Sequence, residues 1–445
     1  MIRSVADGAA NKVADDGEKP IDPRQLQGLK RLRHILPLLA GLHEVGCERD
    51  KAGNRELHFD EYVTLILLWL FNPMLDSVRA LQKAGELEKV SEQLGVKRFS
   101  LSSFSESVRV FDPDKLRAVV QQLAGELEGQ LKPVNADPRL KDHLGGKALT
   151  MADGTVLDAI ATVARATWLR FQDGTAKHAW KLHLQLDFDT LLPDPGGIEL
   201  TDARNSGTSD EKNVLRSHLR ADCCYVTDRW FGQFTLFNDV RRAGSNYVCR
   251  VKENSTFEVT EERLLSDEAI KAGVIRDAVV TMGLGSKPEA RPDHPVRIVV
   301  IEAEPHEKRG GRRGKTAGPG NKGTIVIATD LLHVPAEVIA LLYQHRYCIH
   351  CIEIFFRFFK QTLGCRHLLS HKPEGILIQV YCAVIACMLL NLWTGKKPTK
   401  RTVEMFAYYF MGVATEKEVL DHLNRPDNTG VKLRAKDELW KKLGV

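Results

Sequence analysis

Residues 223–254 read CCYVTDRWFGQFTLFNDVRRAGSNYVCRVKEN. The stretch opens with an apolar run that ends at Asp228, continues as a segment of helical character, and closes with a second apolar run. A short apolar run bounded by polar residues predicts a buried strand. The stretch therefore predicts a strand, a helix and a strand in succession, which is typical of an α/β sheet.

The segments before this stretch extend the same pattern. Residues 148–159, ALTMADGTVLDA, predict a short strand that ends at Asp153 and is followed by a Gly-Thr turn. Residues 179–189, AWKLHLQLDFD, alternate with the period of two expected of a strand and place leucines on one face. A third strand is predicted at IELTDA (198–203), and a helix at SDEKNVLRSHL (209–219) with Ser209 or Asp210 as its cap. The fold class is therefore a mixed α/β sheet.

The rest of the chain divides into segments that differ in composition and in hydrophobic pattern. The predicted units are a disordered N-terminus (1–23), a helical domain (24–140), the first part of the α/β core (141–254), a β-rich segment with a basic loop (255–332), a helical second part of the core (333–400) and a helical tail (401–445). The helical domain is a candidate DNA-binding unit, although its lysines and arginines fit a solvated face equally well.

Composition favours a cytoplasmic protein. The 445 residues carry a formal net charge of +5, and the nine cysteines show no disulfide framework. The N-terminus has no apolar leader segment. Residues 376–393, ILIQVYCAVIACMLLNLW, fall short of the roughly 20 residues that a bilayer span needs and contain polar residues. They predict a buried core helix and no association with a membrane.

Three carboxylates stand in unusual settings. Asp153 and Asp228 each close a predicted strand, where α/β sheets form their sites. Glu353 lies within IEIFFRFFKQTLGCRHLLS (352–370), among isoleucines and phenylalanines. Burying an unpaired charge is costly, so a partner is expected for it. Three carboxylates suit hard divalent cations such as Mg²⁺, and two such ions can hydrolyse a phosphodiester.

The predicted helix around Glu353 carries a polar face at steps of three or four residues. Its members are Tyr343, Arg346, His350, Glu353, Arg357 and Lys360. A solvated helix face would look similar, but cations beside a metal carboxylate suit a phosphate chain. The basic loop 307–323, with Arg312 and Arg313, is a second candidate contact with phosphates, or else a solvated loop.

A zinc site is a weaker interpretation of the same region. Cys348 and Cys351 form one Cys-x-x-Cys pair, and Cys365 and His367 follow downstream. One pair with a looser second pair is a weak zinc signal. Packing of the cysteines in the core is the favoured interpretation.

Three segments, ADGT, YVTDRWF and EIFFRFFKQTLGCRHL, carry a resemblance to a known family. Together they resemble the DDE transposases of bacterial insertion sequences, specifically the insertion sequence four family with its Y-R-E-K signature. The resemblance covers about residues 60–400. It implies an RNase H-like catalytic domain with a β-rich insertion, preceded by an all-helical domain. It further implies that Asp153, Asp228 and Glu353 hold two Mg²⁺ ions, for which Mn²⁺ can substitute. Lys360, Arg346 and Tyr343 would contact phosphates.

Two positions depart from the family pattern. Six residues, YCIHCI, separate Arg346 from Glu353, where the family has three. Because steps of four and seven residues point nearly the same way on a helix, Arg346 stays on the face of Glu353, and His350 is closer to the usual position. Trp230 stands where the family often has glycine. It could stack on a displaced base, but we predict that it belongs to the core.

The resemblance implies that the protein binds the terminal inverted repeats of its own element as a homodimer on double-stranded DNA. Cut-and-paste transposition through a hairpin intermediate would follow, in the bacterial cytoplasm at the nucleoid. One alternative is a catalytically impaired DNA-binding derivative that acts as a regulator, which the insertion near Glu353 favours. Another is a different RNase H-like nuclease, such as a junction resolvase.

Overall fold

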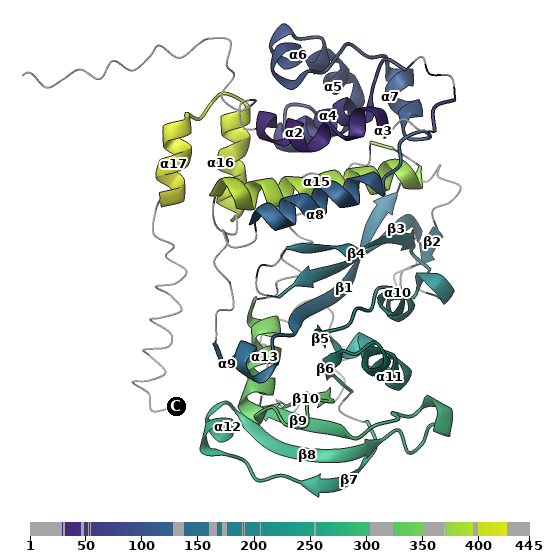
Figure 1. Ribbon diagram of the computed structural model, residues 1–445, viewed down its shortest axis with the longest axis vertical. Coiled ribbons are helices and arrows are strands. Elements are labelled where there is room, and N and C mark those ends of the chain that lie inside the picture. Colours follow the sequence, from purple (N-terminus) through teal and green to yellow (C-terminus); the bar gives the residue numbers. More distant parts are fainter. Residues whose placement is uncertain are drawn as a thin grey trace, which may run out of the picture.

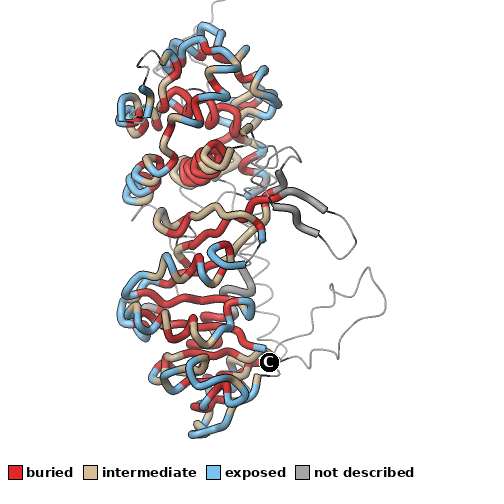
Figure 2. Tube along the Cα trace, turned by 90° about the vertical axis from the view of Figure 1, so that its right-hand side faces the viewer, coloured by how far each residue is buried: buried red, intermediate tan, exposed pale blue. Residues whose placement is uncertain are grey.

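The computed structural model of the protein describes Leu29 and residues 32–127, 138–159, 167–170, 176–302, 324–349, 369–394 and 399–424, with short gaps inside the first, fourth and sixth of these ranges. A helical layer lies at one end of an elongated molecule, and a large sheet extends from it to the other end (Figure 1). The buried residues run through both parts (Figure 2).

One sheet contains all the strands that the structure describes. The strands are β1 (Ala148–Ala159), β2 (Thr167–Arg170), β3 (Ala176–Asp187), β4 (Pro193–Asp202), β5 (Cys223–Thr227), β6 (Asn246–Arg250), β7 (Phe257–Glu262), β8 (Val274–Met282), β9 (Val296–Glu302) and β10 (Thr324–Thr329). Their order is β2-β3-β1-β5-β6-β10-β9-β8-β7, and β4 pairs with β3. β1, β5 and β6 are parallel, and the other pairings are antiparallel.

The strand, helix and strand predicted for residues 223–254 are confirmed as β5, α11 (Phe234–Arg242) and β6. The predicted helix at 209–219 is α10 (Glu211–Ser217), capped by Asp210. The predicted end of the first strand at Asp153 is wrong. β1 continues through Gly154 and Thr155, because β3 pairs with it as far as Ala159 and supplies the backbone partners.

The strands predicted for residues 255–332 are present, and they continue the core sheet. β10 pairs antiparallel with β6, and β9, β8 and β7 follow outward in order. The basic loop with Arg312 and Arg313 lies outside the described residues. The β-rich segment is thus an extension of the sheet, with β7 as its outer edge.

Helices cover the sheet and form the layer at its end. Besides α10 and α11, they are α2 (Leu36–Leu39), α3 (Leu42–Val45), α4 (Phe59–Phe71), α5 (Val78–Gly85), α6 (Glu88–Leu94), α7 (Leu101–Ser107), α8 (Lys115–Leu127), α9 (Pro138–His143), α12 (Asp267–Lys271), α13 (Ala336–Ile349), α15 (Pro373–Thr394), α16 (Lys400–Phe410) and α17 (Glu416–Asn424). Short 3-10 turns connect several of them.

The helical layer is built from both ends of the chain. α15 lies along α8 and also packs on α4, and the three helices share one hydrophobic core with the sheet (Figure 1). In α15 the mean hydropathy reaches 2.2, enough for a membrane span, but 83% of the apolar window is buried inside the protein. The prediction of a buried core helix is confirmed.

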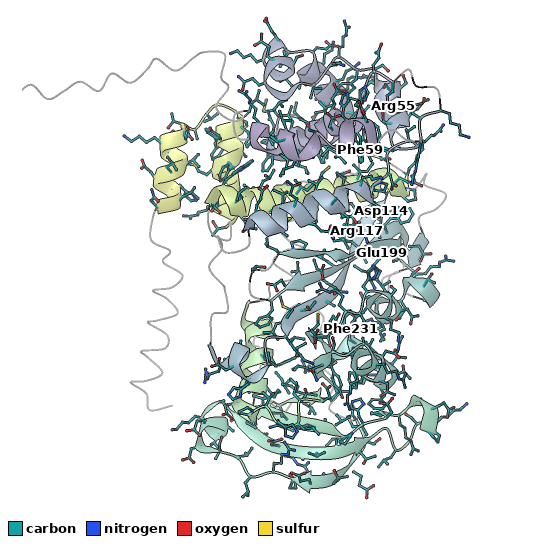
Figure 3. All side chains as sticks on the ribbon, viewed as in Figure 1. Arg55, Phe59, Asp114, Arg117, Glu199 and Phe231 are labelled. Atoms are coloured by element: carbon teal, nitrogen blue, oxygen red, sulfur yellow. The ribbon has the colours of Figure 1, made fainter. Side chains whose placement is uncertain are left out.

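Polar contacts join helices of this layer to one another. The Nε of Arg117 on α8 donates to the hydroxyl of Tyr381 on α15, at 3.3 Å. Arg117 also pairs with Asp114 at 3.3 Å, and Glu199 of β4 lies close to this pair (Figure 3). Both α8 and α15 also pack directly against β4 of the sheet.

Candidate active site

Asp153 and Asp228 occupy matched positions on neighbouring parallel strands. Met151 of β1 lies opposite Val226 of β5, and each aspartate follows two residues further along the chain. Asp153 is still within β1, and Asp228 comes directly after β5. The backbone at Asp228 is still extended. Because paired strands lie about 4.8 Å apart, the two carboxylates emerge at one edge of the sheet.

Backbone amides orient both aspartates. The Oδ1 of Asp153 accepts from the amide of Gly154 at 2.8 Å. The Oδ1 of Asp228 accepts from the amide of Trp230 at 2.8 Å and so caps the short turn Arg229–Phe231. Two oriented carboxylates fit a hard divalent cation, which prefers oxygen ligands. Within the described part of the chain no group of three or more metal-ligating side chains is found, and Glu353 lies outside that part.

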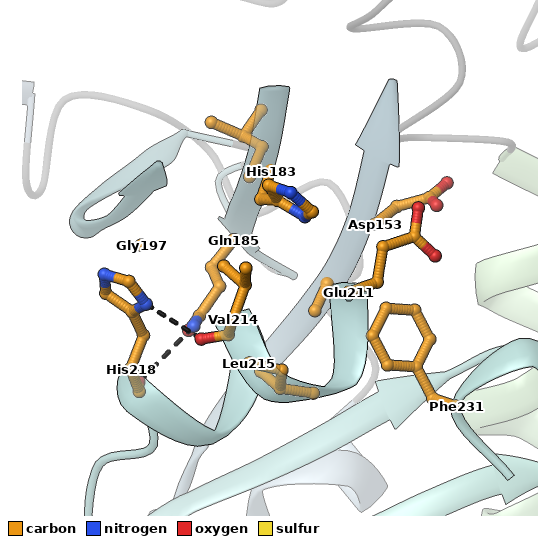
Figure 4. A pocket seen from close by; sticks show the side chains of 11 residues that line it. Asp153, His183, Gln185, Gly197, Glu211, Val214, Leu215, His218 and Phe231 are labelled. Carbon is orange, nitrogen blue, oxygen red and sulfur yellow. Dashed lines mark hydrogen bonds between the residues drawn. The ribbon is translucent and has the colours of Figure 1, made fainter. Parts of the chain in front are cut away.

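A buried ion pair lies directly beside Asp153. The Nζ of Lys181 on β3 is 2.6 Å from the Oε1 of Glu211, the first residue of α10, and both side chains are about nine-tenths buried. Glu211 and Asp153 line the same pocket (Figure 4). A Cβ on Gly154 would lie 2.5 Å from the Oε1 of Glu211. Gly154 therefore leaves room for the side chains of Glu211 and Lys181, and it lies within a strand and not in a turn.

The polar face of β3 continues this buried layer. The Nε2 of His183 lies 2.8 Å from the Oγ1 of Thr201, and the amide of Gln185 donates to the carbonyl of His218 at 3.4 Å. Burial, reinforced by the charges of Lys181 and His218, lowers the pKa of His183 to about 4. His183 is thus neutral at neutral pH.

Sequence reasoning missed this layer. The alternation of Lys181, His183 and Gln185 with leucines predicted the strand, but a polar strand face is ordinarily solvated. α10 covers that face instead. The sequence signal that could have predicted this buried layer was the amphipathic pattern of α10, which follows β4. Glu211 lies on the same side of α10 as Val214 and His218.

Trp230 is exposed, so its prediction as a core residue is wrong. Its side chain is 50% exposed, and the Nζ of Lys212 lies 4.4 Å from the ring centroid. The buried position of this turn belongs to Phe231, which is 2% exposed. Asp228 caps the turn that contains both residues, and in this turn Trp230 points to solvent while Phe231 points into the core.

α13 leads toward Glu353, and β9 anchors its beginning. The Nη1 of Arg297 donates to the carbonyl of Leu331 at 3.0 Å and to that of Val334. Tyr343 on α13 is 1% exposed and packs in the core. Arg346 lies on the same helix.

Several predicted site residues lie outside the described residues. They are His350, Glu353, Arg357, Lys360, Arg312 and Arg313, together with Cys351, Cys365 and His367 of the zinc interpretation. Of the predicted carboxylates, the structure describes Asp153 and Asp228, each two residues beyond the paired Met151 and Val226.

Comparison with known proteins gives consistent matches. The model of the family described as "Transposase DDE domain" matches residues 145–390. The "Putative transposase y4zB" of Sinorhizobium fredii is 25% identical over 213 residues, which are 48% of this chain and 52% of that relative. The "Probable transposase for insertion sequence element IS5377" of Geobacillus stearothermophilus is 23% identical over 69% of this chain and 71% of that relative.

A solved structure was also found. The piggyBac transposase in a synaptic complex with hairpin DNA is 10% identical, with 90% of this chain and 85% of that chain covered. The TM-score is 0.35, and at that value the likeness supports no conclusion about this chain.

Proposed function

Because this chain belongs to the transposase DDE domain family, we propose that it catalyses cut-and-paste transposition of a bacterial insertion sequence. The observation that carries the proposal is the matched placement of Asp153 and Asp228 on parallel strands. The chain spans about half the length of one curated relative, at 52%, so its activity is inferred from its own residues.

The topology supports an RNase H-like core. The strands β4, β3, β1, β5 and β6 lie side by side in that order. β3 is antiparallel to both of its neighbours, β4 and β1, and β5 and β6 run parallel to β1. Asp153 lies on β1 and Asp228 directly follows β5, the neighbouring strand, so a helix from the C-terminal part could bring Glu353 to both aspartates.

In the proposed mechanism Asp153, Asp228 and Glu353 hold two divalent ions, Mg²⁺ or Mn²⁺. When bound, such ions activate an attacking water or 3′-hydroxyl and stabilise the leaving oxygen at a phosphodiester. The amides of Gly154 and Trp230 keep the two aspartates oriented before the ions arrive. Arg346, His350, Arg357 and Lys360 would contact the phosphates near the scissile bond.

The proposed substrates are the terminal inverted repeats of the element and a double-stranded target DNA. A homodimer would hold two ends together, and a hairpin intermediate would release the element. Arg312 and Arg313 of the basic loop would add contacts with the DNA backbone. We place the protein in the bacterial cytoplasm, at the nucleoid.

Cleavage of DNA that carries the end repeats tests the proposal. We expect wild type to cut in Mg²⁺, and Asp228→Asn and Glu353→Gln to lose cutting while they still bind this DNA. The exposed Asp293, which pairs with Arg242 away from this edge, supplies the control Asp293→Asn, and this variant should cut normally. If wild type binds the repeats without cutting, the regulatory alternative replaces the proposal. Cutting of branched junctions alone would favour a resolvase.

A further inference from the structure

The Lys181–Glu211 ion pair is charged, buried and adjacent to a carboxylate that the proposed mechanism uses. Its two atoms are 2.6 Å apart, and its side chains are only 11% and 10% exposed. Polar groups in such a place are usually explained by packing or by hydrogen bonding. Here the pair lies against Gly154, the residue after Asp153. A Cβ added to Gly154 would be 3.0 Å from the Cε of Lys181 and 2.5 Å from the Oε1 of Glu211.

We propose that Lys181 and Glu211 form a positioning pair that sets the charge around Asp153 and thereby the affinity of the site for divalent cations. The inference rests on the proposed metal-dependent function. As a pair, the ammonium and the carboxylate nearly cancel. Glu211 thus stays beside Asp153 without adding a full negative charge to the cation site, and Lys181 stays there without repelling the cation.

The charge of Lys181 already acts on a neighbour in the same layer. After burial, the coulombic effect of Lys181 is the next largest influence that disfavours the protonated form of His183. Burial strengthens such effects because less water screens them. Asp153 lines the same pocket as His183 and Glu211 (Figure 4). Lys181 is 2.6 Å from Glu211 and reaches Gly154, the residue after Asp153, so the charges of Lys181 and Glu211 both lie near Asp153.

The two single variants distinguish this role from packing. Glu211→Gln leaves the ammonium of Lys181 without the Glu211 carboxylate, so Mn²⁺ should bind about tenfold more weakly. Lys181→Met leaves the Glu211 carboxylate without its ammonium beside Asp153, so Mn²⁺ should bind about tenfold more tightly. The double variant Lys181→Met/Glu211→Gln should return to within about twofold of wild type. A packing role predicts instead that both single changes weaken binding.

The experiment titrates the full-length protein, without DNA, with Mn²⁺ alone and follows free Mn²⁺ by electron paramagnetic resonance. Lys83→Met and Glu86→Gln, which break the exposed pair on α5 with an Nζ–Oε2 distance of 3.1 Å, are matched controls and should leave the affinity unchanged. Asp153→Asn should lower it. Single changes in opposite directions support the inference, and changes in the same direction overturn it.

Two further outcomes separate this inference from the proposed function. If wild type binds no Mn²⁺, or if Asp153→Asn binds it as well as wild type does, the metal-dependent function fails and the inference fails with it. If the single variants do not fold, Lys181→Glu/Glu211→Lys retains an ion pair and brings the ammonium against Gly154. Weaker Mn²⁺ binding by that variant supports the inference, and unchanged binding overturns it.

Discussion

Arg297 on β9 holds Asp277 on β8 through two hydrogen bonds, 2.8 Å from Nε to Oδ1 and 2.7 Å from Nη2 to Oδ2, and both side chains are buried. The third nitrogen of the same guanidinium donates to carbonyls of the segment before α13. One arginine therefore ties the outer strands of the sheet to the helix that leads toward Glu353.

Arg297→Met should destabilise the protein by about 3–5 kcal/mol, because it leaves the Asp277 carboxylate buried without its partner. Urea unfolding measures the change. The control is Arg276→Met, which breaks the exposed pair between Arg276 on β8 and Glu262 on the neighbouring β7 and should cost less than about 1 kcal/mol. Equal losses in the two variants would show that the buried pair has no special role.

Gly154→Ala should push the Glu211 side chain out of its ion pair with Lys181, because the new methyl would lie 2.5 Å from the Oε1 of Glu211. We expect a loss of about 1–3 kcal/mol in stability and at least a tenfold loss in DNA cleavage. Gly125→Ala on the exposed side of α8, where nothing lies within 4 Å, should instead stabilise the protein by up to about 1 kcal/mol. Normal cleavage by Gly154→Ala would contradict the close approach.

Trp230→Ala and Phe231→Ala should differ widely despite their adjacent positions. The exposed Trp230 loses only its contact with Lys212, at a cost of about 1 kcal/mol or less. The buried Phe231 leaves a cavity, at a cost of about 3–5 kcal/mol. Thermal unfolding of the two variants measures the difference. A large loss of stability in Trp230→Ala would mean that Trp230 is a core residue after all.

His183 should make the fold sensitive to acid. Its folded pKa of about 4 lies below the unfolded value of 6.5, so the unfolded state binds more protons between these values. Stability is then full above about pH 6.5 and falls as the pH drops toward 4, by about 2–3 kcal/mol.

The measurement compares unfolding free energies at pH 7 and pH 4.5. His183→Gln is uncharged at both values, so it should lose less stability between them than wild type does. Identical losses in wild type and variant would mean that His183 is not buried in its neutral form.

The sequence predicted those elements that depend on residues close together in the chain. The apolar runs of β5 and β6 and the alternation of β3 depend on neighbouring residues, and they predicted these elements correctly. Asp-Gly-Thr after Ala152 has the composition of a turn, but it forms strand because β3 pairs with it. The junction of β10 with β6 joins segments that are far apart in the chain, and the sequence contains no pattern for it.

The same distinction applies to the candidate site. The end of β5 before Asp228 was visible in the sequence, but the strand end predicted at Asp153 was wrong, and the register of β1 against β5 was not visible. Lys181 and Glu211 become neighbours only because α10 folds over β3. The exposure of Trp230 likewise depends on the turn that Asp228 caps.

The position of α15 has a consequence for synthesis. Arg117 and Tyr381, which meet between α8 and α15, are 264 positions apart in the chain. The residues of α4 are buried almost without exception, and part of their cover comes from α15. During translation the apolar faces of α4 and α8 stay exposed until α15 has been synthesised. Closing this long loop slows folding, and chaperones can bind the exposed faces in the meantime. A nascent chain that stops before residue 373 would therefore be a substrate for proteolysis and not a folded fragment.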